Sequence, residues 1–85
     1  MNLFIIERYI QKIRKEDIYN YAYIQGINVN SCDLNTIYNY LKTYYKTFLY
    51  NKEIRPKLLT ELKSKVAPDI AYKLEELYYQ YNDKI

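Results

Sequence analysis

Tyrosine accounts for 13 of the 85 residues, and the tyrosines recur at helical spacing beside isoleucine and leucine. Only one Gly and two Pro interrupt the chain, so few positions break a helix. Apolar side chains that recur every three or four residues indicate the buried stripe of an amphipathic helix. We therefore predict an all-α fold, a compact bundle of about five short helices, formed as a single domain by residues 1–85.

The few helix-breaking residues place the ends of the predicted helices. Gly26 follows an apolar segment at the position where a left-handed cap is favoured, and Pro68 with Asp69 is typical of a helix start. Asn30 or Ser31 supplies an N-terminal cap for the clearest amphipathic helix of the chain. The predicted helices cover about 2–14, 16–25, 32–45, 54–66 and 68–82, with a loop over 46–52. Two alternatives stay open: the apolar pattern of the third helix extends to Phe48, or a short turn precedes the fourth helix.

The reactive side chains argue against an enzyme. The chain has no His, so the common acid–base group near neutral pH is missing. Cys32 is the only cysteine; it has no His partner and is more simply read as a small buried residue than as an activated thiol. Glu75 and Glu76 diverge around their helix and do not form a metal site. We predict a non-catalytic protein with no metal and no cofactor.

The compartment follows from apolar run length and cysteine usage. No segment approaches the ~20 apolar residues of a membrane span. The apolar start is cut short by Glu7 and Arg8, before the core of a signal peptide could form. A single cysteine suits a reducing environment. We expect a cytoplasmic protein with no membrane partner.

Basic residues are concentrated in one segment. The chain carries a net charge of +3, and residues 42–65 hold seven Lys or Arg against two Glu. These charges either solvate helix faces or form a patch for an acidic partner such as single-stranded nucleic acid. The candidate nucleic-acid-binding residues are Lys42, Lys46, Lys52, Arg55 and Lys57.

A second group of candidates consists of large apolar residues that lie off the predicted buried stripes. Aromatic rings in such positions either close a second layer of core or contact a partner, where they are favoured. The leading prediction is a small helical module that binds a protein partner or self-associates; single-stranded nucleic-acid binding is the alternative. The candidate partner-binding residues are Phe4, Ile5, Tyr19, Tyr23, Tyr40 and Tyr79.

Several short segments, taken in order, carry a family resemblance. They are Met1 to Ile6, Asp17-Ile18 with Tyr21-Ala22, Gly26 to Val29, Ile37 to Lys42, Glu53 to Arg55 with Leu58-Leu59, and Val66 to Ala71 with Lys73 to Leu77. In order and spacing the chain resembles the YqfT-like family of small uncharacterised proteins from low-GC Gram-positive bacteria, a domain of unknown function. The resemblance covers nearly the whole chain but contains no motif specific to one chemistry, and the tyrosine content exceeds what the family leads us to expect. It implies a helical, cytoplasmic bacterial protein, and it brings no activity and no catalytic residue.

Overall fold

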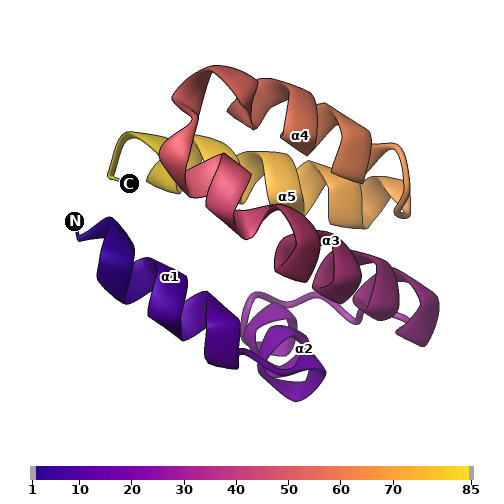
Figure 1. The fold of residues 1–85 in the computed structure, drawn as a ribbon. Coiled ribbons are helices and arrows are strands. Elements are labelled where there is room, and N and C mark those ends of the chain that lie inside the picture. Colours follow the sequence, from indigo (N-terminus) through magenta and orange to yellow (C-terminus); the bar gives the residue numbers. More distant parts are fainter. Residues whose placement is uncertain (1, 85) are drawn as a thin grey trace.

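The longest helix, α3 (Ser31–Tyr50), is central to the fold, and the other helices pack against it or against its neighbours (Figure 1). The computed structural model describes residues 2–84, and within this range it contains helices and no strand. The predicted all-α bundle of short helices is confirmed. The remaining elements are α1 (Leu3–Lys12), α2 (Lys15–Ile24), a 3-10 turn η1 (Lys52–Ile54), α4 (Arg55–Lys63), α5 (Pro68–Tyr81) and a 3-10 turn η2 (Asn82–Lys84).

Local chemistry sets most of the helix ends. The side chain of Asn30 caps α3, because its Oδ1 accepts a hydrogen bond of 2.8 Å from the backbone N–H of Asp33. Gly26 ends the turn after α2 with a φ of +81°, a conformation that L side chains rarely adopt. The N–H of Ile27 then donates to the carbonyl of Ala22 at 2.9 Å. Pro68 occupies the first turn of α5, as its position in the sequence predicts.

The predicted loop over 46–52 is wrong, because α3 continues through Tyr50. Phe48 and Leu49 extend the apolar stripe of this helix by one more turn, and Leu49 is only 2% exposed. The helix predicted over 54–66 also ends early, at Lys63. There the Ser64 hydroxyl donates to the Glu61 carbonyl at 2.6 Å and the chain tightens into a turn.

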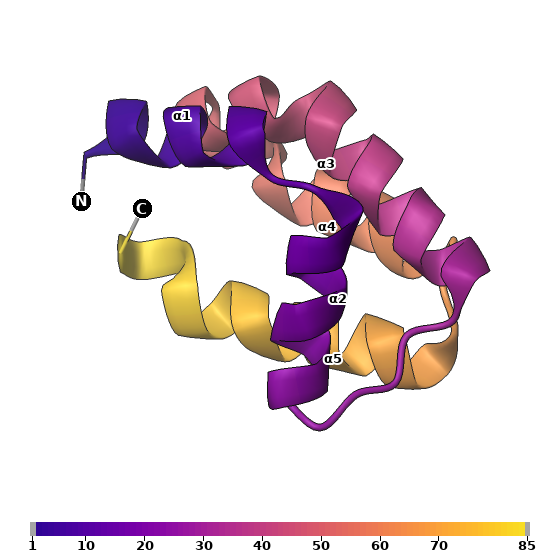
Figure 2. The same cartoon turned by 90° about the horizontal axis from the view of Figure 1, so that it is seen from below.

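The helices form two units, which meet where α3 contacts α4. In the first unit α1 and α2 pack on α3, and in the second α4 and α5 form an antiparallel pair (Figures 1 and 2). Within residues 2–84, no Cα atom of α5 lies within 8 Å of a Cα atom of α1, α2 or α3. The two ends of the chain lie at the same end of the molecule in both views. The second unit is thus joined to the first without close packing of α5 along α3.

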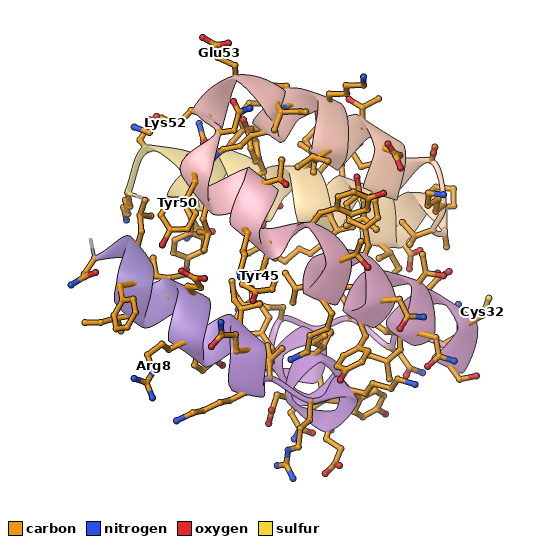
Figure 3. The ribbon with its side chains drawn as sticks, in the orientation of Figure 1. Arg8, Cys32, Tyr45, Tyr50, Lys52 and Glu53 are labelled. Atoms are coloured by element: carbon orange, nitrogen blue, oxygen red, sulfur yellow. The ribbon has the colours of Figure 1, made fainter. Side chains whose placement is uncertain are left out.

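Polar side chains fasten α1 to α3. The Nζ atom of Lys42 donates to the carbonyls of Ile10 and Gln11, at 2.7 and 2.9 Å, and so satisfies the C-terminal end of α1. The Gln11 amide donates to the Tyr45 hydroxyl at 3.2 Å, and the Tyr50 hydroxyl donates to Glu7 at 2.7 Å. Figure 3 shows Tyr45 and Tyr50 on the side of α3 that faces α1. These contacts run from Glu7 to Gln11, in the middle and C-terminal part of α1.

Arg55 ties the C-terminal ends of α3 and α5 together, and it is only 1% exposed. Its Nε donates to the carbonyl of Phe48 at 2.6 Å, and its Nη2 donates to the carbonyl of Leu49 at 3.0 Å. The Nη1 atom reaches the side-chain oxygen of Asn82, just after α5, at 3.1 Å. The guanidinium therefore satisfies carbonyls that a helix end leaves without partners, where a positive charge is also favoured.

Asp33 makes the matching tie at the N-terminal ends of the same two helices. It is 7% exposed, and its Oδ2 accepts from the backbone N–H of Ala67, the residue before α5, at 3.1 Å. The same oxygen accepts from the amide of Asn30 at 3.2 Å. Polar contacts thus hold α5 to α3 at both ends.

We expect Arg55→Met to lower the free energy of unfolding by about 2–4 kcal/mol, because it leaves buried carbonyls without donors. Urea denaturation followed by circular dichroism measures the change. Lys57→Met is the matched control on the same helix: Lys57 is exposed, so the change should stay within about 0.5 kcal/mol. Equal effects of the two substitutions would contradict the role given to Arg55.

Candidate functional site

An apolar cleft of about 460 Å³ lies between the two helical units. All five α-helices contribute to its walls, and its size is within the range typical of ligand-binding pockets. A smaller hollow of about 70 Å³ adjoins it and shares the lining residues Ile18, Tyr21, Ile37 and Leu74. The cleft is lined by Tyr9, Ile13, Asp17, Ile18, Tyr21, Ile37, Tyr40, Leu41, Tyr44, Tyr45, Phe48, Leu58, Leu59, Leu62, Leu74, Leu77, Tyr78, Tyr81 and Asn82.

The cleft exists because few apolar side chains are fully enclosed. Among the described residues, the buried apolar side chains are Val29, Leu49, Leu58 and Ile70. The predicted inward stripes of α3 and α5 do face the interior, but many of their residues line open space and remain half-exposed. Seven of the lining residues are tyrosines, whose rings contact apolar neighbours while their hydroxyls can remain in water.

Two tyrosines of the cleft, Tyr21 and Tyr40, have pKa values raised above their usual value. Burial raises the pKa of Tyr21, and the neighbouring Tyr81 adds to this effect. Burial raises the pKa of Tyr40, and the negative charge of Glu61 adds to this effect. The Tyr40 hydroxyl donates to the carbonyl of Leu58 on α4 at 3.0 Å. These rings therefore offer neutral donors and acceptors at the edge of an apolar surface.

The structure divides the predicted partner-binding residues. Phe4, Ile5, Tyr23 and Tyr79 are between 59% and 72% exposed, and Tyr19 is 40% exposed, so these five do point outward. They come from three helices, and none of the five lines the cleft. The placement of Tyr40 outside the core is wrong: its ring is half-buried in the cleft wall, 4.5 Å from the ring of Tyr44 between centroids.

The predicted basic patch loses two of its five members. Arg55 is buried, and its guanidinium is used by backbone carbonyls and Asn82. Lys42 is half-buried, and its ammonium caps the end of α1. Lys46, Lys52 and Lys57 are exposed, and Figure 3 shows Lys52 extending from the surface near Glu53. The predictions for Arg55 and Lys42 are therefore wrong.

The reading of Cys32 as a buried residue is also wrong. Cys32 is exposed in the first turn of α3, at the surface in Figure 3. Among residues 2–84 there is no group of three His, Cys, Asp or Glu side chains that could hold a metal ion. No helix in the same range is long and apolar enough to span a membrane.

Of the residues that line the cleft, only Tyr40 is among the candidates predicted from the sequence. One signal was available: an unusual share of tyrosine within predicted core stripes indicates positions that stay in contact with water.

Searches against models of protein families, curated proteins and solved structures gave no match to this chain. The resemblance to the YqfT-like family therefore stays a prediction. The functional interpretation rests on the geometry of the cleft.

We expect stability to fall at alkaline pH through the tyrosines of this fold. Tyr21, Tyr40 and Tyr50 have pKa values raised above 10.0, the last chiefly by its hydrogen bond to Glu7. A raised folded-state pKa contributes stability that is complete below pH 10.0 and is lost as the pH rises through the folded pKa. Urea midpoints measured between about pH 8 and 11 should therefore decline above about pH 10.

The variant Tyr21→Phe/Tyr40→Phe should show a shallower decline, since two of the titrating hydroxyls are gone. Tyr23→Phe, on the exposed side of α2, is the control and should follow the parent chain. Parallel curves for the parent and the double variant would contradict the assignment.

Proposed function

We propose that this chain is a non-catalytic protein-interaction module that binds the apolar face of one amphipathic helix of a partner in the cleft. The observation that carries the proposal is an open cleft of about 460 Å³ lined by eight aromatic and nine aliphatic residues. A cleft of this kind leaves apolar surface in contact with water, and covering that surface is favourable.

The walls of the cleft favour a helix as the bound element. They consist of helices throughout, and residues 2–84 contain no strand whose edge an extended peptide could join. A helix in a groove is recognised by side chains at i, i+3, i+4 and i+7, which enter a hollow together. The half-exposed tyrosines along the walls suit such contacts, since tyrosine is enriched at protein interfaces.

The alternative of single-stranded nucleic-acid binding has less support. Of its five candidate residues, only Lys46, Lys52 and Lys57 are exposed, and Lys46 lies 4.0 Å from the carboxylate of Glu7. None of the three lines the cleft, so no aromatic stacking platform accompanies them there.

A labelled amphipathic peptide with leucines at i, i+3, i+4 and i+7 and an uncharged polar face tests this proposal. We expect fluorescence anisotropy to show saturable binding to the chain. Leu77→Trp places an indole in the cleft and should weaken binding by at least about tenfold, a loss of ~1.4 kcal/mol. Leu74→Phe, from the same wall, is a smaller change of the same kind, and circular dichroism verifies that each variant is folded.

Tyr79→Trp is the matched control, because Tyr79 lies on the same helix but is 70% exposed and outside the cleft. It should bind the peptide like the parent chain. Loss of binding in Tyr79→Trp with none in Leu77→Trp would instead move the interaction to the outward tyrosines. Absence of binding by the parent chain would contradict the proposal.

A further inference from the structure

The one charged residue that lines the cleft is acidic. Its lining contains a single charged residue, Asp17, and no Lys or Arg. The chain as a whole carries 13 Lys or Arg and a net charge of +3. The cleft is therefore an apolar and aromatic surface whose one charge is negative, in a protein that is otherwise mildly basic.

Three cations near the cleft or the smaller hollow are engaged within the fold. Lys42 donates to carbonyls at the end of α1, and Arg55 donates to the carbonyls of Phe48 and Leu49. Lys73, which borders the smaller hollow, contacts Glu76 at 2.8 Å. Arg14 lies 3.7 Å from Asp17, and Lys84 lies 5.7 Å from the centroid of the Tyr81 ring, but neither residue lines the cleft. An anionic group buried in the cleft would therefore lose its hydration without a cation in the lining.

Asp17 retains capacity to accept from a cation. Its Oδ2 accepts from the backbone N–H of Arg14 at 2.9 Å and lies 3.7 Å from the Arg14 Nε. Its Oδ1 has no hydrogen-bond or ion-pair partner within residues 2–84. The Arg14 side chain is 68% exposed, so water weakens its interaction with this carboxylate. The seven tyrosine rings add faces that attract a cation.

We infer that the partner helix carries a lysine or arginine at the edge of its apolar face, with the cation placed against Asp17 and the tyrosine rings of the cleft. The inference rests on the proposed function, because it specifies the chemistry of the helix bound in the same cleft. The apolar side chains fill the cleft, and the basic residue orients the helix within it.

The net charge of the chain predicts the opposite preference. A protein of charge +3 attracts acidic peptides and repels basic ones through its long-range field. A preference for a basic peptide therefore requires a local interaction that overcomes this field. Tighter binding of the basic peptide would indicate the local interaction, and tighter binding of the acidic peptide would indicate the long-range field.

Three peptides with the same apolar face and with Lys, Gln or Glu at its edge form the test. We expect affinities in the order Lys, Gln, Glu, with the first and last differing by at least about tenfold at physiological salt. Asp17→Asn should reduce this ratio to about threefold or less, while the asparagine side chain still accepts from the Arg14 N–H and preserves the start of α2. Glu16→Gln is the matched control: it removes the same charge from the neighbouring position, is exposed and does not line the cleft.

The outcomes separate this inference from the proposed function. If the Gln peptide does not bind the parent chain, the proposed function itself fails. If the Gln peptide binds but the Glu peptide binds as tightly as the Lys peptide or more tightly, the inference is overturned and the proposed function stands. An unchanged Lys preference in Asp17→Asn, or an equal loss in Glu16→Gln, would overturn the assignment to Asp17.

Discussion

The guanidinium of Arg55 is the contact on which the arrangement of the helices most depends. A fully buried cation is costly unless each of its N–H groups finds an acceptor, and here the acceptors are the carbonyls of Phe48 and Leu49 together with Asn82. The guanidinium donates to carbonyls in the last turn of α3, and the same side chain holds the residue that follows α5. Asp33 does the same for the opposite ends of these helices through the Ala67 N–H. Two polar ties therefore join α5 to α3 at both ends, while α5 packs along its length on α4.

The cleft is a consequence of these ties. The α5 helix is held to α3 at its ends, and none of its Cα atoms lies within 8 Å of a Cα atom of α3. Space therefore remains between the two backbones. Side chains from all five helices point into this space without filling it. Positions that are apolar on one side and wet on the other suit tyrosine better than leucine or phenylalanine. Seven of the 13 tyrosines are thus explained by a fold with little enclosed core and a large half-exposed interior surface.

Periodicity was sufficient to predict five helices, and Gly26 and Pro68 marked two of their ends, because these signals are local. The extension of α3 to Tyr50 was missed because the N–H groups that donate to the carbonyls of Phe48 and Leu49 belong to Arg55, beyond the predicted loop. Arg55 was assigned to a surface patch because arginine is rarely buried, and only the fold shows its three partners. Tyr40 was placed outside because its partner, the carbonyl of Leu58, is 18 residues away. A predicted inward stripe tells which way the side chains point, but it does not tell whether they fill the interior.

The most direct test of this account is methyl NMR of the protein under xenon pressure, because xenon enters apolar space regardless of any partner. The account predicts saturable shifts for the methyl groups of residues that line the cleft on opposite walls, such as Ile37 and Leu77, and none for Ile24, which is 77% exposed and outside it. If Ile37 and Leu77 show no shift, or if all three residues show equal shifts that do not saturate, the two units close on each other and the cleft does not exist in solution.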